Sequence, residues 1–94
     1  MKKTVGFIVY HRVDYDGLFS AAIIQDYLVR ELGYEKVLTK GWNYGDSIPE
    51  LPKIGKDELC HVFLVDISFP PEDMKRLKEL SGGYRAIWID HHIG

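Results

Sequence analysis

Short, continuous runs of apolar residues constrain this 94-residue chain more than any other feature. The run Val5–Tyr10 is rich in β-branched and aromatic residues and has no regular polar alternation. Such a run is typical of a strand that is buried on both faces, as in a parallel sheet. Apolar runs at His61–Ile67 and Tyr84–Ile89 predict two further strands.

Helical patterns occupy the segments that follow the first and second of these runs. Residues Gly17 to Leu32 carry apolar side chains at near-helical spacing, and Gly33 suits the position just after a helix ends. Pro70 and Pro71 suit the first turn of a second helix, which the Gly pair at 82–83 would stop. The sequence therefore predicts two helices that connect strands.

One further strand is expected around 36–40, and 41–56 is expected to be a long loop, which is often functional in a compact domain. The resulting element order is β-α-β-β-α-β. Right-handed crossovers then favour an α/β fold, with a parallel, doubly wound sheet of about four strands in the order 2-1-3-4 and helices packed on it. Ligands of such sheets gather beyond the carboxyl ends of the strands.

Composition and charge restrict the functional classes only mildly. The net charge of −2 gives no electrostatic reason for tight, non-specific binding of nucleic acid. Phosphorylated substrates remain compatible with it, because bound divalent metals would supply positive charge. The single cysteine, Cys60, favours a reducing compartment, and the run at 5–10 is too short for a signal segment or a membrane span. We expect a cytoplasmic protein without a membrane partner.

Polar clusters follow three of the predicted strands. His11, Asp14 and Asp16 come directly after the first strand. Asp66 follows Val65 near the end of the third, and Asp90-His91-His92 follows the last. Because the carboxyl ends of parallel strands meet at one edge of a sheet, we expect these clusters to lie close together.

Each cluster also has a simpler explanation. Asp16 could cap the following helix, Asp66 could bind backbone amides of the next turn, and Asp90–His92 could be a fortuitous polar terminus. None of these explains why all three clusters fall at the same sheet edge.

Carboxylate and imidazole ligands without a nearby Cys favour Mn²⁺ or Mg²⁺ over structural zinc. Two such ions, about 3.5–4 Å apart, would activate water to hydrolyse a phosphoester or phosphoanhydride.

Several neighbouring residues have weaker claims to a function. Arg12 could contact a phosphate, although a solvated Arg is more common. His61 is predicted to be structural or exposed, and Cys60 is predicted to be a small buried hydrophobe. Trp42 and Tyr44 could stack on a base, or they could pack back onto the sheet.

At the polar clusters the chain resembles the DHH phosphoesterase superfamily. The first motif of that family is a His followed by Asp-x-Asp, here His11 and then 14–16; the second is a lone Asp after an apolar strand, here Asp66. The third is Asp-His-His, here 90–92. The segment 42–46 also looks like the Tyr-Gly loop of one branch, which favours a RecJ-like or oligonucleotide-type member. Two residues separate His11 from Asp14, whereas the pyrophosphatase and cyclic-dinucleotide branches usually have three. This spacing counts against pyrophosphatase-like hydrolysis of a phosphoanhydride, which is kept as an alternative.

The resemblance implies a two-ion site for Mn²⁺, with Mg²⁺ as a substitute. Its expected metal ligands are His11, Asp14, Asp16, Asp66 and His91. The first two would hold one ion and Asp16 and His91 the other, with Asp66 as the bridge. His92 would orient the scissile phosphate or supply a proton to it, and Asp90 would support the histidines.

Residues 1–94 resemble the N-terminal part of the family's catalytic domain. Family members continue into a fourth motif and a second, substrate-gripping domain, so we expect this segment alone to have weak activity or none. The expected reaction is cleavage of phosphodiester bonds in single-stranded nucleic acid, short oligonucleotides or nucleotides. A different class of function is an incomplete metal- or phosphate-binding fragment that forms a homo-oligomer through exposed sheet edge and apolar surface.

Overall fold

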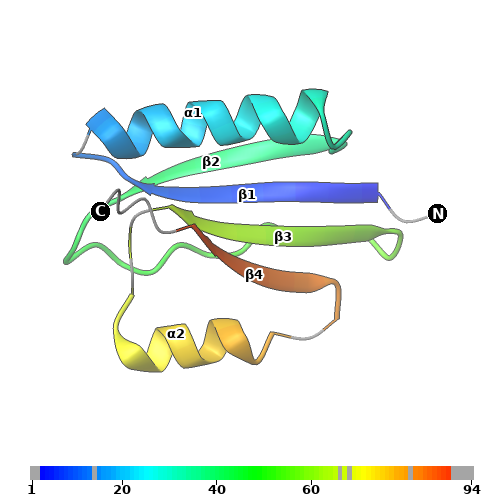
Figure 1. Ribbon diagram of the computed structural model, residues 1–94. Helices are drawn as coiled ribbons and strands as arrows, with labels where there is room; N and C mark the ends of the chain where they lie inside the picture. The colour runs from blue at the N-terminus through cyan, green and yellow to red at the C-terminus, as the bar shows by residue number, and fades with distance from the viewer. Residues whose placement is uncertain (1–2, 14, 66, 68, 81, 90–94) are drawn as a thin grey trace.

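Four parallel strands form one sheet, in the order β2-β1-β3-β4 (Figure 1). The computed structural model describes residues 3–13, 15–65, 67, 69–80 and 82–89. The strands are β1 (Lys3–His11), β2 (Lys36–Trp42), β3 (Glu58–Val65) and β4 (Tyr84–Ile89). The predicted α/β class, the parallel direction and the strand order are therefore confirmed.

The two helices lie on opposite faces of the sheet, as Figure 1 shows. Helix α1 (Tyr15–Arg30) packs on β1, β2 and β3, whereas α2 (Pro71–Lys78) packs against β4. No helix in the described part of the chain is long and apolar enough to cross a membrane. The doubly wound arrangement thus follows from one helix on each face.

Element boundaries differ from the predicted ones for local reasons. The predicted loop at 41–56 begins two residues later, because Gly41 and Trp42 pair with Tyr10 and His11 of the long central strand. Helix α1 ends at Arg30 rather than Leu32, and Gly33 then takes a positive φ of 69°. The two added residues extend β2 toward the edge of the sheet where the polar clusters begin.

Side chains of the central strands alternate between two cores, as the pleat of a strand requires. The core beneath α1 is built from a small set of buried residues: Ile8, Ala21, Leu28, Phe63 and Val65. The core on the α2 side is made of other buried residues: Phe7, Val9, Trp42, Cys60, Val62, Leu64, Ile67 and Phe69. Burial of β1 on both faces is as predicted, and the same alternation puts His11 on the α2 side with Val9.

Candidate functional site at the carboxyl ends of the strands

The strands that precede the three polar clusters end as neighbours in the sheet. Tyr10, one residue before His11, is the register partner of Val65. Val65 is in turn the partner of Ile89. His11 itself lies opposite Trp42, the last residue of β2. The described strand ends therefore bring the starting points of all three clusters to one edge of the sheet.

The predicted ligand set falls largely beyond the described residues. Five predicted site residues lie outside them: Asp14, Asp66, Asp90, His91 and His92. For Asp16, only the backbone is described, in the first turn of α1. Within the described residues, no group of three or more His, Cys, Asp or Glu side chains could hold a metal ion. The predicted two-ion site therefore stays a prediction, and His11 is the one predicted ligand whose side chain lies within the described residues.

His11 is half-buried and held by the loop after β2. Its Nε2 lies 3.0 Å from Oδ1 of Asn43, and its ring meets that of Tyr44 edge-on at 5.5 Å. The Asn43 Oδ1 atom also accepts the Tyr44 backbone N–H at 2.9 Å, so this atom is an acceptor toward His11 as well. His11 consequently donates from Nε2, and in the neutral ring Nδ1 keeps its lone pair. A metal-ligating histidine commonly donates one ring N–H to a neighbouring acceptor and binds the metal through its other ring nitrogen. The contact with Asn43 gives His11 this arrangement.

A tight turn over Asn43–Asp46 supplies these contacts. The Asp46 N–H donates to the Asn43 carbonyl at 2.9 Å, and Gly45 has a φ of 96°. A positive φ at the third position is the mark of a type II turn, which favours glycine there. The Asp46 carboxylate accepts the Asn43 N–H at 3.0 Å, which closes the turn.

The turn is tied to the segment after β1 by an ion pair. Arg12 donates from Nε to Asp46 at 3.1 Å, and its backbone N–H donates to the Trp42 carbonyl at 3.0 Å. The hydrogen bond from Arg12 lowers the pKa of the Asp46 carboxyl, and the backbone N–H of Asn43 lowers it further. The Asp46 contact in turn raises the pKa of Arg12. Arg12 is thus exposed but already paired, so it is a weaker candidate for phosphate binding.

An aromatic pocket lies beside the turn. It has a volume of about 530 Å³ and lies between 42–48 and the start of α2, where Phe69, Pro70 and Asp73 line it. The Trp42 ring packs edge-on against Phe69 at 4.8 Å and against Tyr44 at 5.2 Å. Trp42 is 2% exposed, whereas Tyr44 is 60% exposed. Of the two proposed stacking residues, Trp42 packs back onto the sheet and Tyr44 remains open to a ligand.

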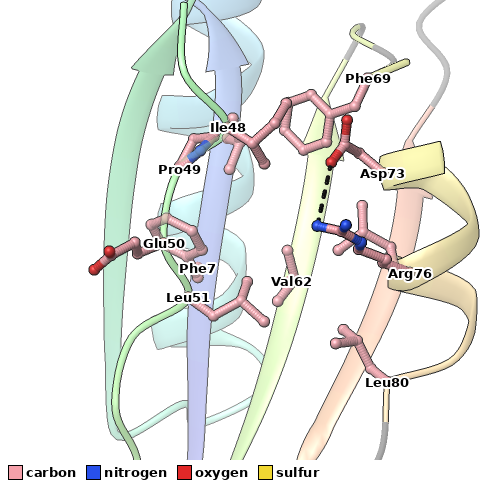
Figure 2. Close-up of a pocket in the computed structure, with 12 residues that line it drawn as sticks. Phe7, Ile48, Pro49, Glu50, Leu51, Val62, Phe69, Asp73, Arg76 and Leu80 are labelled. Atoms are coloured by element: carbon pink, nitrogen blue, oxygen red, sulfur yellow. Dashed lines mark ion pairs between the residues drawn. The ribbon is translucent and has the colours of Figure 1, made fainter. Parts of the chain in front are cut away.

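A second pocket continues from the first along the same face (Figure 2). Its volume is about 320 Å³, and it shares Ile48, Phe69 and Asp73 with the aromatic pocket. Figure 2 shows the loop on one side and α2 on the other, with Phe7 and Val62 of the sheet between them. The two pockets therefore form one groove, aromatic near the strand ends and apolar beneath α2.

Other ionisable residues lie away from this edge. The Tyr34 hydroxyl is 2.6 Å from Nδ1 of His61, and burial and then Arg85 lower the pKa of His61. His61 is therefore structural, as predicted. Cys60 is fully buried, as predicted, and burial raises the pKa of its thiol to about 11. Neither residue provides a nucleophile for this site.

Sequence reasoning missed the residues that organise the site. Asn43 and Asp46 fix His11 and Arg12, and the Asn-x-Gly-Asp order of a tight turn was a readable signal for them. Phe69 and Asp73 line the groove from beyond β3. They carry no such signal, because their role depends on how α2 meets the loop.

Comparisons of the chain with protein-family models, with curated proteins and with solved structures give no match. The resemblance to the DHH phosphoesterases accordingly depends on the three sequence motifs alone.

Proposed function

We propose that this chain provides a DHH-type phosphohydrolase centre, which uses Mn²⁺, or Mg²⁺ in its place, to cleave phosphodiester bonds of oligonucleotides, nucleotides or single-stranded nucleic acid. The observation that carries the proposal is the alignment of strand ends. β1, β3 and β4 end as register neighbours, and each is followed in the sequence by carboxylate or imidazole side chains. Ligands of parallel sheets gather at this edge.

The surroundings of His11 support a metal-ligand role. Its Nε2–H is engaged by Asn43, and Asn43 is itself fixed by the Tyr44 backbone. A ring held through Nε2–H leaves Nδ1 as the nitrogen that would ligate a metal, and the ring need not reorganise to do so. The donor chemistry of the remaining predicted ligands, carboxylate and imidazole, fits Mn²⁺ and Mg²⁺.

The proposed mechanism assigns each residue a separate task. When bound, the two ions would supply an activated water and neutralise charge on the phosphoryl group. Asp66 would hold both ions from the end of β3, and His11 would hold one of them from the end of β1. His92 would orient the phosphate and give a proton to the departing oxygen, with Asp90 supporting it. The water oxygen would bond to phosphorus as the P–O ester bond breaks, with one proton of the water released to solvent and one proton given by His92 to the ester oxygen.

The test is Mn²⁺ binding and hydrolysis by the chain and its variants. We expect Mn²⁺ binding by calorimetry and weak, Mn²⁺-stimulated cleavage of a short single-stranded oligonucleotide. Asp66→Ala and His91→Ala should abolish the cleavage and weaken binding. Asp26→Ala removes a carboxylate that is paired with Arg30 on the outer side of α1, so it serves as the matched control and should leave both unchanged.

Two results would overturn the proposal. One is a folded protein that neither binds Mn²⁺ nor cleaves the oligonucleotide. The other is binding and cleavage that Asp66→Ala leaves intact. Cleavage of inorganic pyrophosphate in preference to the oligonucleotide would instead support the pyrophosphatase-like alternative.

A second candidate function is metal or phosphate binding by a chain that self-associates. Three large apolar side chains at helical spacing on α1 favour it: Phe19, Ile23 and Tyr27 are 70%, 65% and 52% exposed. Contiguous exposed apolar side chains of this kind tend to find partners. Light scattering tests the idea, since Ile23→Lys should then convert an oligomer to a monomer. A wild-type monomer at high protein concentration would contradict it.

A further inference from the structure

The aromatic pocket beside Tyr44 plays no part in the metal chemistry, and it lies where the remainder of a substrate would extend. We propose that this pocket binds the nucleobase of the substrate, and that Asp73 makes guanine the preferred base. The inference rests on the proposed function, because it identifies the kind of phosphorylated substrate that the strand-end site would receive.

Tyr44 provides the stacking surface. Tyr44 is 60% exposed, and its ring makes edge-on contacts with Trp42 at 5.2 Å and with His11 at 5.5 Å. An exposed ring that two neighbouring rings already hold in place loses little freedom when a base stacks on it. Every nucleobase has a face for such stacking, and its loss weakens binding by about tenfold or more.

Asp73 provides the polar recognition. Asp73 lines both parts of the groove, and its side chain is 23% exposed. Its ion pair with Arg76 has a separation of 4.0 Å, and the Arg76 side chain is 81% exposed, so the pair leaves acceptor capacity on the carboxylate. Guanine offers adjacent ring N–H and amino donors to two carboxylate oxygens. Uracil offers a single ring N–H, so a guanine preference follows.

The position of the pocket agrees with a nucleotide that spans two sites. Trp42 is the register partner of His11, and Tyr44 contacts the His11 ring. A base on Tyr44 would therefore leave its phosphate close to the strand ends. The volume of about 530 Å³ is also in the range of about 300–1,000 Å³ that is typical of small-ligand pockets.

The experiment measures guanosine binding in EDTA by tryptophan fluorescence. The chain has two tryptophans, so a Trp88→Phe background leaves Trp42, which lines the pocket, as the sole reporter. We expect saturable quenching by guanosine and weaker binding of uridine. Tyr44→Ala should weaken guanosine binding about tenfold, whereas Tyr44→Phe should retain it. Leu32→Ala, which truncates a 53% exposed side chain just beyond the end of α1, is the control and should have no effect.

Asp73→Asn tests the base preference separately. We expect it to reduce guanosine binding to about the level of uridine, with uridine binding unchanged. Circular dichroism confirms that each variant is folded. Absence of guanosine binding at millimolar concentration, or an unchanged affinity in folded Tyr44→Ala, would overturn the inference. Equal binding of guanosine and uridine by the wild type would overturn the role of Asp73.

Guanosine has no phosphate and EDTA removes divalent metals, so this measurement is independent of hydrolysis. Mn²⁺-dependent cleavage without guanosine binding would overturn the pocket inference and leave the proposed function standing. Guanosine binding by a folded chain that neither binds Mn²⁺ nor cleaves the oligonucleotide would overturn the proposed function and leave the pocket inference standing.

Discussion

The two faces of the sheet are covered in different ways. On one face, the 16-residue helix α1 packs on three strands and places Ala21 and Leu28 in the core. On the other, none of the eight residues Pro71–Lys78 of α2 is buried, and a groove separates the helix from the loop. Helix α1 therefore closes its face of the sheet, whereas α2 leaves a groove open near the strand ends.

The sharpest test of this difference is to truncate one leucine on each helix. Leu28 is 3% exposed beneath α1, so Leu28→Ala should lower the free energy of unfolding by about 2–5 kcal/mol. Leu77 of α2 is partly buried beside the groove, and Leu77→Ala should have a smaller effect, about 1 kcal/mol. Urea unfolding measures both values. Equal losses would show that the two faces are equally well packed.

A single added methyl group tests how tightly α1 approaches β1. A Cβ on Gly17 would lie 3.0 Å from the His11 carbonyl oxygen and 3.3 Å from its nitrogen. Gly17→Ala should therefore destabilise the protein by about 1–3 kcal/mol, because the backbone must move to relieve the overlap. At Gly55, the sole contact that a Cβ would make is with the Glu58 side chain at 3.4 Å, so Gly55→Ala is the control. A neutral Gly17→Ala would mean that α1 is free to shift.

Acid should weaken the α1 face through His61. Burial and Arg85 hold the folded-state pKa of His61 below its ordinary value of 6.5. The unfolded chain then binds more protons, so the stability is complete above about pH 6.5 and declines as the pH falls below it. Urea midpoints at about pH 7.5 and 5.5 should differ less in His61→Gln than in the wild type. If the two midpoints differ by the same amount in His61→Gln and in the wild type, His61 is not the cause of the pH dependence.

On the α2 side, Asn43 should affect the His11 ring more than the stability. Asn43→Ala removes the acceptor of the His11 Nε2–H, with an expected loss of about 1 kcal/mol. Nitrogen NMR of the His11 ring should then show a mixture of tautomers in place of the Nε2–H form. A single tautomer that persists in Asn43→Ala would contradict the proposed role of the turn.

The smallest effect is expected from the ion pair that anchors the turn. Arg12 and Asp46 are both exposed, and pairs of this kind stabilise proteins by less than about 1 kcal/mol. Arg12→Ala should therefore leave the urea midpoint almost unchanged. It should raise the pKa of Asp46, which proton NMR can follow, because the hydrogen bond from Arg12 is the main cause of its lowering. A large loss of stability would indicate that the turn supports the α2 face as well.

The sequence was a good guide to the fold because the decisive signals are local. The buried run Val5–Tyr10 and the helical spacing after Gly17 each needed only a few neighbouring residues to be recognised. The strand order then followed from chain connectivity. By contrast, the end of β2 at Trp42 was missed, since it depends on pairing with the distant His11.

The sequence indicates where the candidate site would lie, but it does not indicate which residues hold His11 and Arg12 in place. Parallel strands that each end before a polar cluster indicate the edge directly. The contact of Asn43 with His11 joins residues 32 positions apart, and no periodicity reports such a pairing. The groove depends on the gap between α2 and the loop at 48–51, and that gap is a property of packing rather than of any motif.

The absence of buried side chains in Pro71–Lys78 has a consequence for motion. A helix with so little buried apolar surface is released by local opening at a far smaller free energy than the global unfolding of the chain. Its amide hydrogens should therefore exchange with solvent well before those of β1 and β3. A small molecule that bridges the loop and α2 would slow that exchange selectively. The fold thus places the well-packed helix α1 and the weakly packed helix α2 on opposite sides of one sheet.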